Sequence, residues 1–239
     1  MSDIRCSNNS LGLEFVPAGT DGVLFCKWLT RLQDYQVFVE DTGHGIEAPG
    51  FEQGPDHPAV NVSWEDAQQF CQWLTRKERT VGVISSSAVI RLPTDHEWSV
   101  AVGIGERENP NVSPKRKDGQ IPGIYPWGTA WPPPAGAGNF AGAERPDLDP
   151  GDLKDYNDGF PYTSPVGSFQ PNVHGLYDMA GNVHEWVEDT LSFDGVMRVM
   201  RGGSWYTNLP PALISSRRDA ALPNERSSRV GFRCVLVMR

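Results

Sequence analysis

Apolar residues first recur at helical spacing between residues 32 and 39. They fall on one face of a helix, and the pattern stops at Gly43. Thr30 and Gln33 have the spacing of a capping box, in which the threonine caps the first turn and the glutamine reaches back. The pattern therefore predicts an amphipathic helix that starts after Thr30 and ends at Gly43.

A second helix is predicted to begin at Ser63. Serine is a good N-cap, and the two carboxylates that follow in the first turn complement the positive end of a helix. The apolar residues between 67 and 74 share one face. We therefore expect Cys71 to point into the core.

A strand and a third short helix are predicted next. The apolar run 89–92 ends at a proline, which favours an extended exit. Thr94 and Glu97 then form a capping box, and the helix is expected to end at Gly103.

The middle of the chain, residues 103–172, is rich in Pro, Gly, Asn and Asp and has no hydrophobic period. We expect Trp127 and Trp131 to anchor it and ligands or metal ions to hold it, because long irregular loops inside a domain are unusual. Strand-like alternation returns at 196–201 and 230–237. There is no internal repeat and no linker-like tract, so residues 1–239 are expected to form a single domain with its core at about 10–238.

The composition narrows the possible partners. The chain has 25 Gly and 20 Pro, which favours many turns over a helical bundle. Its formal net charge of -9 offers no basic surface for nucleic acid. No stretch approaches the roughly 20 apolar residues of a membrane helix, and residues 1–6 lack the apolar core of a signal peptide. We expect neither a nucleic-acid nor a membrane partner, and a cytoplasmic location.

Cysteine and histidine give no sign of a metal centre. Cys6, Cys26, Cys71 and Cys234 are too few for a disulfide scaffold and lack C-x-x-C spacing. We interpret them as small buried apolar residues. The five histidines are scattered without partners at ligand spacing, so no non-haem iron site is predicted.

Short motifs in the later part of the chain combine turn residues with aromatic or charged ones. Gly202 and Gly203 predict a place where backbone approaches backbone or takes positive φ. The turn at 181–185 suits a hard cation, because it offers carbonyl oxygens and a carboxylate. Four motifs occur in this order: Arg91-Leu92-Pro93-Thr94-Asp95-His96-Glu97-Trp98, Gly175-Leu176-Tyr177-Asp178-Met179-Ala180-Gly181-Asn182-Val183-His184-Glu185-Trp186, Arg201-Gly202-Gly203-Ser204-Trp205 and Gly231-Phe232-Arg233-Cys234.

In this order and spacing the motifs resemble those of the formylglycine-generating enzyme (sulfatase-modifying factor) family, over about residues 10–238. The resemblance implies an α+β fold of the C-type-lectin-like type, loop-rich with short strands and a few helices, and stabilised by calcium. It also implies that Cys71 and Cys234 lie side by side in the core, joined only in an oxidising compartment.

The resemblance implies two calcium sites. The first would use Asp178 and Glu185 with the carbonyls of Gly181 and Val183. The second would use Asn139 and Asp158 with the carbonyls of Phe140 and Phe160. The alternative is that these carboxylates cap turns without any metal.

The copper centre of the family's oxidases is not expected here. Members carry two cysteines after the R-G-G-S segment, and the matching positions are Thr207 and Ala212. Copper(I) selects thiolates, which neither side chain can replace. Ser204 and Arg218 match positions near the family's active site and would be catalytic only if the chain were an enzyme; both can also serve as turn and surface-bridging residues.

The favoured hypothesis is a non-catalytic binding module, a pseudoenzyme that recognises a protein or small-molecule ligand through residues 205–229. Aromatics and arginines mix there as in recognition surfaces. An ordinary loop surface is the competing interpretation. The candidate ligand-binding residues are Trp205, Tyr206, Thr207, Asn208, Leu209, Ala212, Ile214, Arg217, Asn224 and Arg226.

Three other hypotheses stay open. The chain resembles the variable proteins of diversity-generating retroelements, and a near-copy of segment 206–213 beside a reverse transcriptase would distinguish this case. A divergent oxidase or metalloenzyme acting on a peptide or small thiol would depend on Ser204 and the nearby arginines. The domain could also serve as the sensor arm of a larger protein or operon system.

Overall fold

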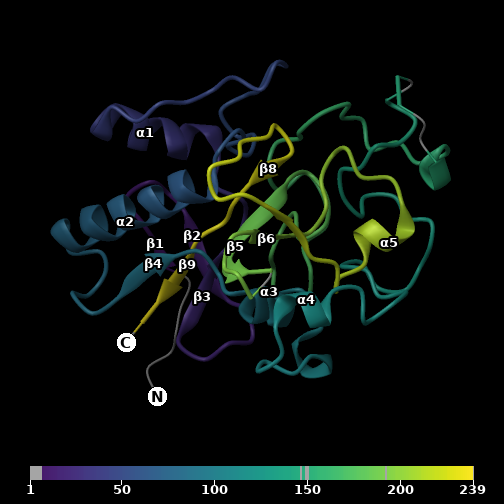
Figure 1. Ribbon diagram of the computed structural model, residues 1–239. Helices are drawn as coiled ribbons and strands as arrows, with labels where there is room; N and C mark the ends of the chain where they lie inside the picture. Colours follow the sequence, from purple (N-terminus) through teal and green to yellow (C-terminus); the bar gives the residue numbers. More distant parts are fainter. Residues whose placement is uncertain (1–6, 146, 149–150, 192, 239) are drawn as a thin grey trace.

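The computed structural model describes residues 7–145, 147–148, 151–191 and 193–238. Two small sheets lie among helices and long loops (Figure 1). The first sheet has the strand order β1-β2-β3-β9-β4, with every neighbouring pair antiparallel. Its strands are β1 (Ser7–Asn8), β2 (Glu14–Pro17), β3 (Val23–Cys26), β4 (Val89–Arg91) and β9 (Val235–Val237).

The second sheet has the order β7-β6-β5-β8. The pair β5 and β8 is parallel, and the other pairs are antiparallel. Its strands are β5 (His184–Thr190), β6 (Arg198–Arg201), β7 (Asp219–Ala221) and β8 (Val230–Gly231).

The predicted strand-like run 230–237 is not one strand. Its first two residues form β8 in one sheet, and its last three form β9 in the other. Between them the backbone bonds elsewhere: the Phe232 carbonyl accepts from Thr30 N (2.9 Å) and the Cys234 carbonyl accepts from Cys26 N (2.9 Å). The segment therefore connects the two sheets.

Helix α1 (Leu32–Thr42) exists as expected, but its predicted cap is wrong. The capping box is formed by Arg31 and Asp34, because the Asp34 carboxylate accepts from the Arg31 amide (3.0 Å) and pairs with its guanidinium. Thr30 is fully buried, and its amide and carbonyl bond to other segments. The end at Gly43 is confirmed, with φ of 71°.

The predicted starts of the next two helices are confirmed. Ser63 accepts from Asp66 N at the start of α2 (Trp64–Thr80), and Thr94 accepts from Glu97 N at the start of α3 (Asp95–Ala101). In both helices the carboxylate at the third helical position, Asp66 in α2 and Glu97 in α3, accepts a hydrogen bond from the backbone amide of the cap residue. No helix in the described part of the chain is long and apolar enough to cross a membrane.

The middle of the chain is largely irregular, as expected. Its described residues contain only the short helices η1 (Gly105–Arg107), α4 (Pro114–Lys117) and η2 (Gly151–Leu153); α5 (Pro210–Leu213) follows later. Trp127 stacks on Tyr125 with ring centroids 4.9 Å apart, and Trp131 lies 5.3 Å from the same ring. Both tryptophans anchor these loops, which form the right-hand side of Figure 1.

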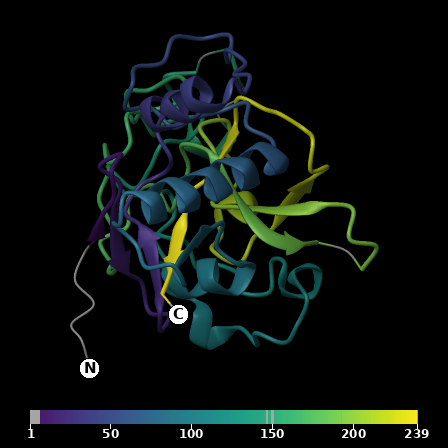
Figure 2. The ribbon, with the colours of Figure 1, turned by 90° about the vertical axis from the view of Figure 1, so that its left-hand side faces the viewer.

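The largest core cluster joins α1 and α2 to the first sheet, and it includes Trp186 of β5. Figure 2 shows α2 running across the strands of the sheets. Cys71 and Cys234 lie in this cluster with their Sγ atoms 3.5 Å apart, so their predicted neighbourhood is confirmed. Both are free and buried, as is Cys26; Cys6 lies outside the described residues.

Candidate recognition site

The turn that contains Ser204 is closed by its own hydroxyl groups. The Ser204 amide donates to Thr207 Oγ1 (3.1 Å), and the two hydroxyl oxygens lie 3.3 Å apart. Gly202 and Gly203 have φ of 93° and 74°. A Cβ on Gly203 would come within 2.8 Å of Leu213. The prediction that these glycines allow positive φ and a close approach is confirmed.

The two positions that match the copper-binding cysteines are half-buried in this region. The Thr207 carbonyl accepts from Ala141 N (3.1 Å), and Ala212 belongs to α5. The three described cysteines all lie buried elsewhere, in other segments of the chain. Around Ser204 the described residues therefore offer no thiolate for copper(I).

Arg218 is fully buried rather than at the surface. Its guanidinium donates to both oxygens of Asp95 (2.9 and 3.0 Å) and to both oxygens of Glu108 (2.6 and 2.6 Å). Arg201 and Lys117 also reach Asp95, each at 2.5 Å. We call these five residues the buried charge cluster. The guanidinium group of Arg218 is fully engaged in this cluster, so the side chain has a structural role in the core.

Aromatic rings from distant segments meet beside the Ser204 turn. Phe51 stacks on Tyr162 with ring centroids 4.4 Å apart. Trp205 packs edge-on against both rings, at 5.6 and 5.1 Å, and Tyr206 lies 5.6 Å from Trp205. Trp205 itself is buried and donates from its indole nitrogen to the Ser228 carbonyl (3.0 Å).

Two arginines stack on these rings. Arg145 lies 4.8 Å from the Tyr162 ring centroid, and Arg229 lies 3.7 Å from that of Tyr206. Tyr162 and Tyr206 remain 38% and 36% exposed. Exposed aromatic rings combined with guanidinium groups are typical of recognition surfaces. We call this group the aromatic surface; it consists of Phe51, Arg145, Tyr162, Trp205, Tyr206 and Arg229.

The predicted ligand-binding residues do not form one continuous surface. Ile214 packs among the anchoring aromatics of the irregular loops, and Arg217 pairs with Asp118 and Asp219. Trp205 is buried; the half-buried residues are Thr207, Asn208, Ala212, Ile214 and Arg217, and the exposed ones are Tyr206, Leu209, Asn224 and Arg226. Sequence reasoning missed Phe51, Arg145 and Tyr162, which come from segments with no local signal for a site.

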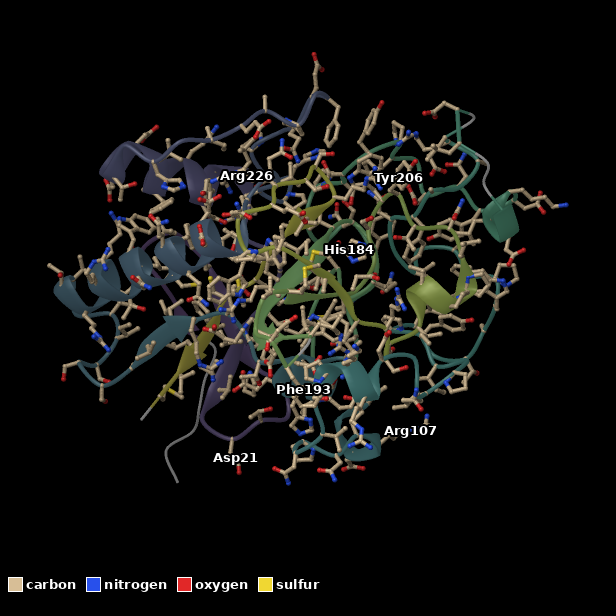
Figure 3. The ribbon with its side chains drawn as sticks, in the orientation of Figure 1. Asp21, Arg107, His184, Phe193, Tyr206 and Arg226 are labelled. Atoms are coloured by element: carbon tan, nitrogen blue, oxygen red, sulfur yellow. The ribbon has the colours of Figure 1, made fainter. Side chains whose placement is uncertain are left out.

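A pocket of about 300 Å³ lies beside Arg229. Its walls come from β5, β6, β7 and segment 225–230, and His184 lines it. We call it the His184 pocket. Figure 3 shows His184 near the middle of the view, with Arg226 and Tyr206 above it. A larger cavity of about 570 Å³, lined mostly by apolar residues such as Ile104 and Leu176, shares no lining residue with it.

The residues of the first predicted calcium site lie together in the core. Glu185 is fully buried, and both its oxygens accept from Arg233 (2.6 and 2.9 Å). Asp178 Oδ2 accepts from Gly167 N (2.8 Å), while its Oδ1 is buried without a partner among the described residues. Burial raises the pKa of Asp178 to about 6. Asp178 thus has a buried oxygen that no described group satisfies, so the residues fit a hard cation.

The residues of the second predicted site also fit a cation. Asp158 accepts from the amides of Phe140 (2.8 Å) and Phe160 (2.9 Å), and burial raises its pKa to about 7. Asn139 Oδ1 and Glu144 Oε2 are both buried and without a hydrogen-bond partner in the part of the chain that is described. No group of three or more His, Cys, Asp or Glu side chains among the described residues is placed to hold a metal ion by itself, so backbone carbonyls would have to complete either site.

The structure combines two sheets of short strands, long anchored loops and a Gly-Gly-Ser turn beside the start of β5. These features are those of a mixed helix-and-sheet protein of the formylglycine-generating-enzyme type. Residues 28–238 match the family model described as "Sulfatase-modifying factor enzyme 1-like domain". The chain therefore belongs to this family.

Individual relatives include both active and inactive members by name. The chain is 32% identical to the inactive Cα-formylglycine-generating enzyme 2 of Bos taurus, over 77% of this chain and 52% of that protein. It is 29% identical to the formylglycine-generating enzyme of Thermomonospora curvata, over 79% of this chain and 59% of that protein. The chain thus spans little more than half the length of these relatives.

Among solved structures, Treponema denticola variable protein 1 has the same fold. It superimposes with a TM-score of 0.62 at 20% identity, covering 98% of this chain and 94% of that one. The mixed helix-and-sheet fold with short strands, predicted from the motifs, is confirmed.

Proposed function

We propose that this protein is a non-catalytic recognition module that binds a protein or small-molecule ligand through the aromatic surface and the adjoining His184 pocket. The observation that carries the proposal is the pair of residues at the copper positions, Thr207 and Ala212. The exposed side chains of Tyr162, Tyr206 and Arg229 support it further, since such groups anchor ligands. Its similarity to a relative named as inactive is in keeping with this function.

We expect the protein to bind no copper(I) at the Ser204 turn, because thiolates are needed there. In a competition assay with a coloured copper(I) chelator, the unmodified chain should leave the chelator loaded. The double variant Thr207→Cys/Ala212→Cys restores two thiols and should withdraw one equivalent of copper. The variant Thr207→Ser/Ala212→Ser is the matched control and should behave like the unmodified chain.

The same preparations test catalysis directly. Incubated with copper and a cysteine-containing sulfatase-type peptide, the unmodified chain should form no aldehyde. Stoichiometric copper in the unmodified protein together with aldehyde formation would contradict the proposal and favour the oxidase hypothesis.

We further propose that calcium stabilises the scaffold. Asp178, Glu185 and the carbonyls of Gly181 and Val183 would hold one ion; Asn139, Asp158 and the carbonyls of Phe140 and Phe160 would hold the other. The unpartnered oxygens of Asp178 and Asn139 support this assignment. Calcium would neutralise the buried carboxylates and fix the irregular loops on either side of them.

Calcium is expected to raise the free energy of unfolding. Each site contributes about 2.7 kcal/mol when calcium is at 100 times its Kd. Urea titrations with calcium and with EDTA measure the difference. Asp158→Asn should reduce the calcium-dependent gain by the contribution of one site, whereas the exposed control Asp155→Asn should keep it. Identical unfolding curves of the unmodified chain in calcium and in EDTA would refute the assignment.

A further inference from the structure

The wall of the His184 pocket is built from two kinds of side chain. Trp186, Met200 and Val230 are buried and give it an apolar floor. Glu225, Arg226 and Arg229 are exposed and stand at its rim. An apolar floor with a few charged groups at the opening is the usual construction of a small-molecule site, and about 300 Å³ is at the lower end of the range for such sites.

Most charges around the pocket already have a partner. Arg226 pairs with Asp66, with oxygens at 2.8 and 2.7 Å. Asp219 pairs with Arg217 at 2.7 Å. The two charges within each pair neutralise each other, so neither pair requires a charged ligand.

Two rim charges of opposite sign are left. Arg229 stacks on Tyr206, and no carboxylate in the described ranges pairs with its guanidinium. Glu225 accepts only a long bond from Leu222 N (3.3 Å), and no described basic side chain pairs with it. Arg229 can therefore take a carboxylate, and Glu225 can take an ammonium group.

A third polar group in the pocket also lacks a partner. His184 Nδ1 is buried and makes no hydrogen bond with any described residue. The His184 amide donates to the Arg229 carbonyl (2.8 Å), which fixes His184 in the pocket wall next to Arg229 at the rim. A buried polar nitrogen without a partner is costly unless a ligand or water satisfies it.

We propose that the His184 pocket binds a free α-amino acid with an apolar side chain. Its carboxylate meets Arg229, its ammonium group meets Glu225, and its side chain covers the floor formed by Trp186, Met200 and Val230. A zwitterion matches one free cation and one free anion, whereas a simple anion would leave Glu225 facing it. The inference rests on the proposed recognition function and names its ligand class.

The experiment measures the binding of L-leucine, L-methionine and L-phenylalanine by calorimetry, with His184 ring signals followed by NMR. At least one amino acid should bind saturably and shift His184. Its N-acetyl derivative, which lacks the ammonium charge, and its amide, which lacks the carboxylate, should each bind at least 10-fold more weakly. If none of the three amino acids binds, or if both derivatives bind as well as the parent, the inference is wrong.

Substitutions at the exposed residues Arg229 and Glu225 test which charged group of the ligand each of them binds, and they should not destabilise the fold. Arg229→Gln should weaken the amino acid at least 10-fold but leave the amide unchanged, and Glu225→Gln should weaken the amino acid but leave the N-acetyl form unchanged. Ala221→Phe should fill the pocket and abolish binding of all forms. Equal affinity of the unmodified chain and both Gln variants would overturn the assignment. The copper assay is independent, so failure here leaves the non-catalytic proposal standing.

Discussion

Replacement of Asp95 by alanine is expected to lower the free energy of unfolding by about 3–5 kcal/mol. Asp95 is 1% exposed and contacts three cations of the buried charge cluster: Arg201, Arg218 and Lys117. Without it, these three charges stay buried with Glu108 as the one remaining carboxylate of the cluster. Removal of one partner from a buried ionic group is costly because the remaining charges have lost their hydration as well as their counter-ion.

The loss should depend on pH. Burial raises the pKa of Asp95, but Arg201, Arg218 and Lys117 outweigh it and hold the pKa below the ordinary value. A carboxylate whose pKa is lowered in the folded state stabilises the protein above its unfolded pKa of about 3.9, and this contribution is lost as the pH falls through the folded pKa. The free energy of unfolding that Asp95→Ala loses should therefore be largest at pH 7 and should become smaller below about pH 4.

Urea unfolding followed by tryptophan fluorescence measures both effects. Glu14→Gln is the control, because the pair of Glu14 and Lys27 is about one third exposed and should contribute less than about 1 kcal/mol. Equal stability losses for the two variants at pH 7 would show that the cluster does not support the fold.

Replacement of Arg233 by methionine is expected to cost about 3–5 kcal/mol when measured in EDTA. Its guanidinium binds both oxygens of Glu185 and donates to the Tyr177 carbonyl (2.8 Å), and both charged side chains are fully buried. Methionine fills part of the space but leaves the buried Glu185 carboxylate without its counter-ion.

Two further variants separate charge from packing. Arg233→Lys keeps the charge but not the two-pronged contact, so its loss should be intermediate. Glu185→Met/Arg233→Met removes both charges and should be more stable than Arg233→Met alone. A double variant as unstable as the sum of its single variants would contradict this account.

Local chemistry in the sequence predicted the elements whose signals lie within a few residues. The capping boxes that begin at Ser63 and Thr94 each lie within four residues, and Gly43 by itself marks the end of α1. All four residues of strand β3 are buried and show no alternation, so nothing in its sequence distinguishes it from other short apolar runs. Its partner β9 lies more than 200 residues away, at a distance that local patterns do not cover.

The candidate site was predicted in part for the same reason. Tyr206 and Arg226 could be named because the recognition segment is continuous in sequence. Phe51 and Tyr162 join it only through the fold, and His184 gains its pocket only because β7 and β8 lie on either side of the β5–β6 pair. The Thr30 cap failed because tertiary hydrogen bonds occupy that residue, leaving Arg31 to begin the helix.

The division of residues 230–237 between β8 and β9 has a consequence for synthesis. Strand β9 lies between β3 and β4, and β8 pairs in parallel with β5, so this one segment completes both sheets. During translation the second sheet cannot be completed until residues 230–231 have left the ribosome, nor the first until residues 235–237 have, although most apolar residues of the domain emerge before them. The residues before this segment therefore have to be kept from aggregating until it emerges, and folding of the domain should be completed only then.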